Sequence, residues 1–152
     1  IMTTVNMNVN KLNNDSIVPT KGSEYAAGLD LYAYIESGAV DIPAGATVKI
    51  GTGIAAEIPV GCFGGVFARS GLAAKRGLRP SNCVGVVDSD YRGEIIVAIH
   101  NDSDKCETIH NGDRIAQLVV MPYINVSLQE VEELSDTKRG AGGFGSTGVS
   151  LS

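Results

Sequence analysis

The chain has 152 residues, of which 43% are hydrophobic and 19% are charged, as expected for one globular domain with its own core. Acidic residues outnumber basic ones by 17 to 12, and the formal net charge of −5 argues against a surface that binds nucleic acid or an anionic membrane. Three cysteines without a C-x-x-C pair, and no long apolar segment, predict a soluble protein of the cytoplasm or nucleus without disulfides, zinc site or membrane span.

Short β-rich segments, separated by Gly, Pro, Asn and Asp, occupy most of the chain, and no helical periodicity is sustained. This pattern predicts an all-β sandwich or barrel. Strands are predicted over residues 30–34, 47–50, 54–57, 65–68, 84–87, 94–99 and 115–120, with turns at 43–45, 59–61 and 111–113.

One short helix is predicted over residues 71–76, with Ser70 as its N-cap and Gly77 at its end. We expect the β domain to cover residues 1–131. Residues 132–152 are predicted to form a flexible C-terminal arm, which begins as a polar linker and continues as a glycine-rich segment.

The glycine-rich segment of the arm is Arg139-Gly140-Ala141-Gly142-Gly143-Phe144-Gly145-Ser146-Thr147-Gly148. It cannot pack a core, yet its guanidinium, ring and hydroxyls are groups that can close over a nucleotide, so we expect a lid. A disordered terminus without a function is the alternative for the arm taken alone. Its glycines also match G-x-G-x-x-G, but we expect no Rossmann or P-loop helix, because the sequence ends seven residues after Gly145.

Four further segments combine glycines with reactive side chains. Residues 26–31 end with Asp30 entering a strand, and residues 68–73 place Arg69 and Ser70 at the start of the predicted helix, where an anion can bind. Residues 82–93 are predicted to form a hairpin, and residues 112–118 carry an amide into a strand.

Together with the arm, these segments resemble the five motifs of the homotrimeric deoxyuridine triphosphatases (dUTPases), in order, over residues 22–148. The resemblance implies a distorted jelly-roll subunit and a homotrimer whose sites are shared between subunits. It also implies Mg²⁺-assisted attack of water on the α-phosphorus of dUTP, which yields dUMP and diphosphate. This reaction keeps uracil out of DNA and supplies dUMP for thymidylate synthesis.

The third motif, by resemblance, carries the catalytic acid and the nucleoside pocket. Asp88 matches the residue that positions and activates the attacking water, whereas Asp90 is expected to serve the turn or an ion pair. Tyr91 matches the residue whose ring lies against the deoxyribose and rejects UTP. Uracil is expected at the segment that contains Asn82, Val84 and Gly85.

The other motifs, by resemblance, hold the triphosphate and its magnesium ion. Substrate contacts are implied for Arg69, Ser70, Gly71 and Gln117, and in the arm for Arg139 (γ-phosphate), Phe144 (over uracil), Gly145, Ser146 and Thr147. No direct protein ligand to Mg²⁺ is expected, because this ion keeps much of its water and would be held by the phosphates. Asp30 is expected to contact it through water.

Two alternatives remain at this point. A deoxycytidine triphosphate deaminase shares the implied fold, but it needs a carboxylate near C4 of the base, and only Glu94 is close to the predicted hairpin. Release of ammonia from dCTP would identify it. A non-catalytic dUTP-binding regulator or structural trimer would bind dUTP without turnover.

Overall fold

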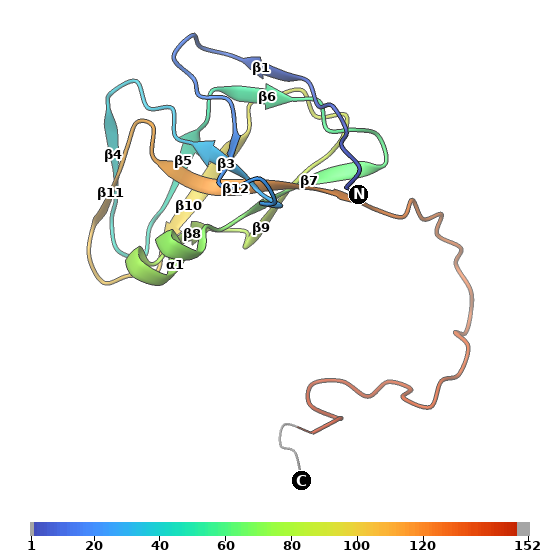
Figure 1. Ribbon diagram of the computed structural model, residues 1–152. Coiled ribbons are helices and arrows are strands. Elements are labelled where there is room, and N and C mark those ends of the chain that lie inside the picture. The colour runs from blue at the N-terminus through green and yellow to red at the C-terminus, as the bar shows by residue number, and fades with distance from the viewer. Residues whose placement is uncertain (1, 149–152) are drawn as a thin grey trace.

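The computed structural model describes residues 2–148, which form twelve strands and one helix (Figure 1). The elements are β1 (Val9–Lys11), β2 (Thr20–Lys21), β3 (Leu29–Tyr32), β4 (Ala39–Ile42), β5 (Thr47–Gly51), β6 (Ile54–Ala56), β7 (Cys62–Phe67), α1 (Ser70–Arg76), β8 (Leu78–Pro80), β9 (Val84–Val87), β10 (Ile96–Asn101), β11 (Glu107–His110) and β12 (Arg114–Pro122). The predicted all-β fold with one short helix is confirmed for this part of the chain. None of its helices has the length and apolar character of a membrane span.

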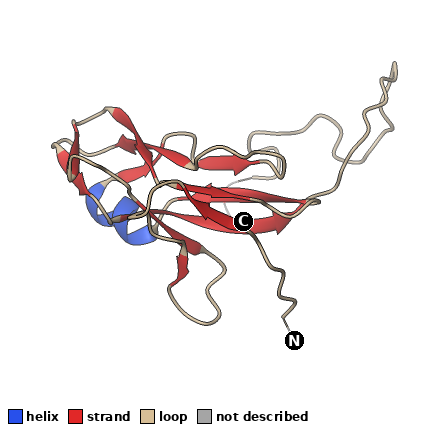
Figure 2. Ribbon diagram, turned by 90° about the horizontal axis from the view of Figure 1, so that it is seen from above, coloured by secondary structure: helices blue, strands red, loops and turns tan. Residues whose placement is uncertain are grey.

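The strands pair only in antiparallel fashion and are arranged in layers, with α1 at one end (Figure 2). The largest sheet has five strands in the order β2-β3-β12-β7-β9. A three-stranded sheet has the order β5-β10-β8, and the pairs β1-β6 and β4-β11 complete the fold. This architecture is of the jelly-roll type, as predicted.

The core lies between the layers and consists of aliphatic side chains. In β10, Val97, Ile99 and Asn101 are buried while the residues between them are more exposed, which is the alternation that a strand with one covered face requires. Leu118 of β12 and Leu31 of β3 have no exposed surface. Burial of a side chain of this size contributes about 1.5–3 kcal/mol relative to exposure, so the core fixes both central strands.

Five strands were not predicted, namely β1, β2, β4, β8 and β11. They have two to four residues each and lack a recognisable apolar run, so their pairing depends on the neighbouring strands. Two of the predicted strand starts also shift by more than one residue: β7 begins at Cys62, and β10 begins at Ile96, so that Glu94 lies in the preceding loop. All three predicted turns contain a glycine with positive φ, at Gly45, Gly61 and Gly112.

The start of α1 corrects the prediction that Ser70 is the N-cap. Arg69 occupies that position: its backbone is extended (φ −90°, ψ 127°), and its carbonyl accepts a hydrogen bond from Ala73 N at 3.0 Å. Ser70 is therefore the first helical residue, and its hydroxyl does not cap the helix. The end is as predicted, with Gly77 in the left-handed region (φ 66°).

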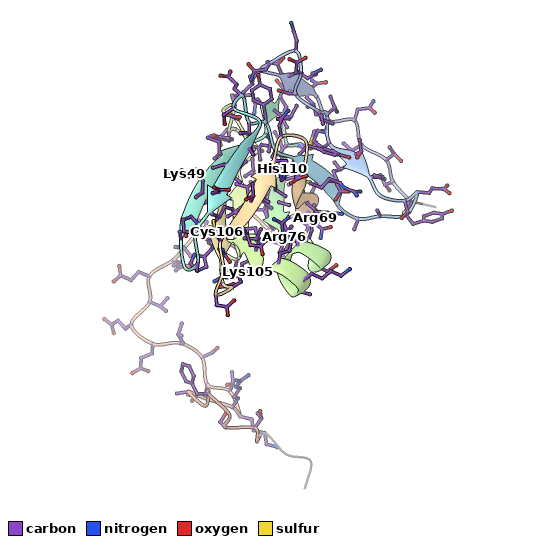
Figure 3. All side chains as sticks on the ribbon, turned by 90° about the vertical axis from the view of Figure 1, so that its left-hand side faces the viewer. Lys49, Arg69, Arg76, Lys105, Cys106 and His110 are labelled. Atoms are coloured by element: carbon purple, nitrogen blue, oxygen red, sulfur yellow. The ribbon has the colours of Figure 1, made fainter. Side chains whose placement is uncertain are left out.

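At the C-terminal end of α1, Arg76 contacts strand β11, which pairs with β4 (Figure 3). Arg76 Nε contacts Glu107 Oε2 at 2.6 Å, and Arg76 Nη2 donates to the Thr108 carbonyl at 2.6 Å. The hydrogen bond from Arg76 lowers the pKa of Glu107, and desolvation of this carboxylate opposes that effect. This contact joins the C-terminal end of the short helix to β11, and packing of Leu72 against the core restrains the helix further.

The prediction of a hairpin over residues 82–93 is wrong, because the strands on either side of its loop are not hydrogen-bonded to each other. Strand β9 pairs with β7, with Val84 opposite Phe67, whereas β10 pairs with β5 and β8. The two strands thus belong to different sheets. The loop between them crosses from one layer to the other and leaves space between β9 and β10.

The chain beyond β12 extends away from the β body (Figure 1). Residues 123–148 form no strand or helix, and nearly all of their side chains are exposed. Regular structure therefore ends at Pro122, before the predicted boundary at residue 131, which stays a prediction. Residue 1 of the predicted domain and residues 149–152 of the predicted arm lie outside the described residues.

Candidate functional site

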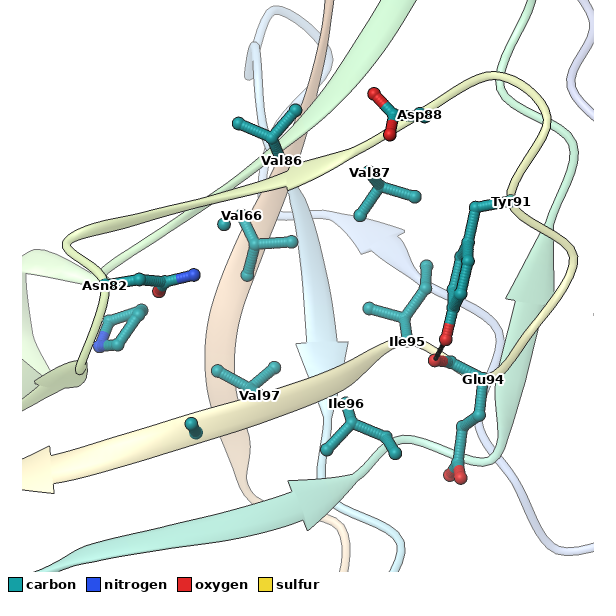
Figure 4. Close-up of a pocket in the computed structure, with 13 residues that line it drawn as sticks. Val66, Asn82, Val86, Val87, Asp88, Tyr91, Glu94, Ile95, Ile96 and Val97 are labelled. Atoms are coloured by element: carbon teal, nitrogen blue, oxygen red, sulfur yellow. Dashed lines mark hydrogen bonds between the residues drawn. The ribbon is translucent and has the colours of Figure 1, made fainter.

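The first pocket lies where β9 and β10 diverge and has a volume of about 270 Å³ (Figure 4). Part of its wall is aliphatic, and Asn82, Asp88, Tyr91 and Glu94 contribute polar groups. The apolar wall comes from Val66, Val86, Val87, Ile95, Ile96 and Val97, together with Pro80 and Ala98. A narrow space of this kind suits a flat ring with polar edges, such as a nucleobase.

Asp88 and Tyr91 are held in one short loop that follows β9. Tyr91 N donates to the Asp88 carbonyl at 3.2 Å, and Tyr91 Oη donates to the Glu94 carbonyl at 2.8 Å. The Tyr91 ring is 44% exposed, and the Asp88 carboxylate is exposed at the rim of the pocket. Asp90 is exposed in the same turn and is not among the residues that line this pocket.

The segment before β9 turns sharply and brings main chain to the other end of the pocket. Cys83 adopts a positive φ of 63°, which is unusual for a residue with a side chain, and Val84 N donates to the Asn82 carbonyl at 2.7 Å. A Cβ atom on Gly85 would come within 3.2 Å of Val66 Cβ, so glycine keeps this wall thin. Gly85 and Asn82 line the pocket, whereas the predicted Val84 lies on β9 without lining it.

The second pocket lies beside the start of α1 and is strongly polar, with a volume of about 270 Å³. Asp30 is at its centre, with a side chain that is 13% exposed. The carboxylate contacts Arg69 Nε at 2.9 Å and Arg114 Nη1 at 3.5 Å. The other lining residues are Gly22, Ala26, Gly28, Ser70, Gly71 and Gln117. Two cations around one acid leave this pocket suited to an anion.

Strand register explains why this second pocket forms. In β12, Gln117 lies opposite Asp30 of β3 on one side and opposite Phe67 of β7 on the other. Its amide donates to the Ala68 carbonyl at 2.9 Å, just before Arg69. A Cβ on Gly28 would lie 2.3 Å from Gln117 Oε1, so glycine is needed where the amide turns in.

The two pockets share no lining residue. Asp88 and Tyr91 line the first, whereas Arg69, Ser70, Gly71 and Gln117 line the second. The fold thus brings the predicted residues together as two groups within one chain. Sequence reasoning assigned no role to Arg114, although it lies in the same segment as Gln117 and its charge could have indicated an anion site.

The predicted residues of the arm lie apart from both pockets (Figure 1). Arg139 Nε donates to the Gly142 carbonyl at 2.9 Å, and Ser146 N donates to the Gly143 carbonyl at 3.1 Å. Phe144 is fully exposed. Gly145 and Thr147 are also exposed, so in the described residues the arm is folded only by contacts with itself.

Neither pocket contains a set of side chains that could hold a metal ion unaided. In residues 2–148, no three His, Cys, Asp or Glu side chains are grouped for that purpose. The two oxygens of Asp30 contact guanidinium groups instead. A metal ion at this site would need oxygen atoms from a ligand.

Comparison with known proteins gives one consistent result. The dUTPase family model matches residues 14–148. A deoxyuridine 5'-triphosphate nucleotidohydrolase of Candida albicans is 50% identical over 133 residues, covering 86% of this chain and 80% of that protein. One from Nautilia profundicola is 47% identical and covers 93% of this chain and 98% of that protein. The dUTPase of Staphylococcus bacteriophage 80alpha, solved with dUpNHpp, has a TM-score of 0.86 at 29% identity, covering 96% of this chain and all of that one.

Proposed function

This chain belongs to the dUTPase family and is an enzyme that hydrolyses dUTP to dUMP and diphosphate, and from that premise we propose how its residues share the reaction. The main observation is the separation of an apolar pocket with Asp88 from a cationic pocket with Arg69. The first fits the nucleoside and the second fits the phosphates. Hydrolysis of the triphosphate needs both.

We propose that one active site combines pockets of different subunits in a homotrimer. One subunit supplies Asp88, Tyr91 and the uracil segment, a neighbour supplies Arg69 and Gln117, and a third lends its arm. The absence of a shared lining residue between the two pockets supports this arrangement. The exposure of the arm supports it as well, because a segment without contacts to its own body is available to another subunit.

Asp88 is proposed to orient the water that attacks the α-phosphorus. The bond from that phosphorus to the bridging oxygen breaks, and diphosphate leaves with the electron pair. The loop that carries Asp88 supports this role, because a backbone hydrogen bond from Tyr91 N and the phenol hydrogen bond to Glu94 restrain its main chain. The contribution of Asp88 comes mainly from orientation and from its local field.

The nucleoside is proposed to lie in the first pocket. Asn82, Gly85 and the main chain at Val84 pair with the edge of uracil, and cytosine would leave buried polar groups unpaired at a cost of about 1–3 kcal/mol each. Tyr91 lies against the deoxyribose, where an added 2′-hydroxyl would collide with its ring. The apolar wall of this pocket and the fixed phenol support this orientation.

The triphosphate is proposed to lie in the second pocket. Arg69 contacts Asp30 through Nε, so its Nη groups can donate to phosphate oxygens. Ser70, Gly71 and Gln117 complete the contacts. In this arrangement Asp30 acts by holding Arg69 and Arg114 in place, which accounts for its low exposure.

The arm is proposed to close over the bound nucleotide. Arg139 reaches the γ-phosphate, Phe144 covers uracil, and Gly145, Ser146 and Thr147 donate hydrogen bonds to phosphates. The full exposure of Phe144 supports this role, because a ring of this size gains by stacking once a base is present. Closure orders a glycine-rich segment and so costs entropy on binding.

Magnesium is proposed as the cofactor, held by phosphate oxygens and water. This choice fits the residues present, because Asp30 is already paired with two arginines and can contact the ion only through water. When bound, the ion offsets the charge of the triphosphate. Removal of dUTP keeps uracil out of DNA and supplies dUMP for thymidylate synthesis, and we propose that the protein acts in the cytoplasm or nucleus.

Of the two alternatives, the deaminase is disfavoured by the contacts of Glu94, the carboxylate that it would need. Glu94 Oε1 accepts a hydrogen bond from Gly53 N at 2.7 Å, and the carboxylate points away from the Tyr91 ring (Figure 4). It is therefore committed to the main chain, which favours hydrolysis at phosphorus over deamination of the base.

A substrate panel with one variant tests the proposal. We expect diphosphate release from dUTP, and far less from dCTP, dTTP and UTP, by a protein with the solution mass of a trimer. Asp88→Asn keeps the side-chain shape and should lower kcat by about a hundredfold or more with an unchanged melting temperature. Release of ammonia from dCTP would instead identify the deaminase, tight binding without turnover by both proteins would identify the regulator, and a fully active monomer would contradict the shared site.

A further inference from the structure

We propose that Glu94 is a positioning residue that sets the place of Tyr91 and so the choice between deoxyribose and ribose. The Glu94 carbonyl accepts the hydrogen bond from Tyr91 Oη at 2.8 Å (Figure 4). The Glu94 side chain reaches in another direction and accepts from Gly53 N at 2.7 Å. One residue thus links the phenol to the turn between β5 and β6.

Two glycines allow the turn between β5 and β6 to contact the Glu94 carboxylate. A Cβ on Gly51 would lie 2.5 Å from Glu94 Oε1, so glycine makes room for the carboxylate. Gly53 has φ +64° and presents its N–H to that oxygen. Next to it, the buried Thr52 donates through Oγ1 to the Ile95 carbonyl at 2.7 Å.

The main chain next to Glu94 is also hydrogen-bonded to this turn. Ile95 N donates to the Ile54 carbonyl at 2.8 Å, although Ile95 precedes strand β10. Glu94 and Ile95 are therefore held outside any strand by three hydrogen bonds to residues 52–54. Removal of the carboxylate would leave Ile95 in place but would remove the contact made by Glu94 itself, the residue whose carbonyl accepts from Tyr91.

The phenol depends on that acceptor because little else fixes it. The Tyr91 ring is 44% exposed, so packing restrains only part of it. It lies across Gly93, where an added Cβ would be 2.5 Å from Oη. The hydrogen bond to Glu94 is thus the contact that defines how far the ring extends over the pocket. The inference rests on the proposed role of Tyr91, because a displaced ring would no longer collide with a 2′-hydroxyl.

Three single variants test the inference, with kcat and KM measured for dUTP and UTP. Glu94→Ala should raise KM for dUTP by about tenfold and lower the preference for dUTP over UTP by a similar factor. Glu94→Gln keeps an oxygen that can accept from Gly53 N–H, so it should restore both quantities to within about twofold of the parent protein. Asp104→Ala removes an exposed carboxylate beyond the opposite end of β10 from Glu94 and should change neither.

A double-mutant cycle shows whether Glu94 acts through Tyr91. In a Tyr91→Phe background, which lacks the phenol hydroxyl, Glu94→Ala should add less than about twofold to the loss of preference. Affinity for dUpNHpp, measured by calorimetry, should follow the same pattern without turnover. Additive losses, or a Glu94→Gln variant as impaired as Glu94→Ala, would overturn the inference.

Two further variants distinguish a failure of the inference about Glu94 from a failure of the proposed role of Tyr91. If Glu94→Ala does not fold, Glu94→Asp carries the test, because its shorter side chain falls short of Gly53 N–H and it should lose preference as Glu94→Ala does. Tyr91→Ala tests the proposed function itself. An unchanged preference in Tyr91→Ala would remove the ribose gate and this inference with it. A lost preference in Tyr91→Ala beside an unchanged one in Glu94→Ala or Glu94→Asp would overturn only the role of Glu94.

Discussion

The β body and the arm both carry predicted substrate contacts, but they hold them in different ways. In the body, Gln117 is fixed by strand register and Arg69 by an ion pair with Asp30 at 2.9 Å. In the arm, Phe144 is fully exposed, and Arg139 bonds only within its own segment in the described residues. The body therefore loses its conformational entropy during folding, whereas under the proposed closure the arm would lose it on binding.

Because of this difference, we expect stability and turnover to be separable in this protein. A change in the arm removes groups that contribute almost nothing to the core, whereas a change in the central strands alters the core and the pocket together. In the described residues the arm makes hydrogen bonds only within itself, which leaves it available for the proposed closure over the nucleotide.

Removal of the glycine-rich segment should have the largest effect on turnover. A chain that ends at Lys138 lacks every predicted lid residue, so we expect kcat/KM for dUTP to fall by about a hundredfold, because the phosphates lose their orientation. The melting temperature should stay within the error of the parent protein. A chain that ends at Gly148 keeps the segment and serves as the control, and full activity of the shorter chain would remove the lid from the mechanism.

One substitution in the β body and one in the arm should separate the stability of the folded protein from the proposed closure of the arm over the nucleotide. Leu118→Ala empties a fully buried position in β12 and should lower the free energy of unfolding by about 2–5 kcal/mol. Phe144→Ala should change it by less than about 0.5 kcal/mol while weakening the affinity for dUpNHpp severalfold. Chemical denaturation at one fixed subunit concentration measures the first quantity. A large loss of stability in Phe144→Ala would mean that its ring packs in the core of the assembled protein.

The smallest expected effect is a change in acid sensitivity. The hydrogen bond from Arg76 lowers the pKa of Glu107 in the folded protein, so its stabilising contribution is complete above the unfolded carboxyl value of about 4.3 and is lost as the pH falls through the lower folded value. Glu107→Gln should therefore flatten the fall in stability below about pH 4.3. Glu133→Gln, in the exposed arm, is the matched control and should leave the profile unchanged, and an identical acid profile for Glu107→Gln would contradict the contribution of this pair.

Much of the fold and of the site could be predicted because the signals were local. The all-β class follows from apolar runs and frequent turns, and the cationic pocket follows from a segment in which Arg69 and Ser70 adjoin glycine. The strands of two to four residues escaped prediction, because they form only against neighbours already in place. The N-cap was placed one residue too late, because a serine before glycine and an apolar run looks like a cap until the extended backbone of Arg69 is seen.

The amino-acid sequence alone specifies which chemical groups are present and in what order: an acid and a ring in one segment, cations and an amide in two others, and a glycine-rich arm. It could not determine that β9 and β10 enter different sheets, which opens the pocket beside Asp88, or that Glu94 turns away to bind Gly53. Those features depend on pairing between residues far apart in the chain. Periodicity reports which face of a strand is covered, whereas the choice of partner depends on how all the layers pack at once.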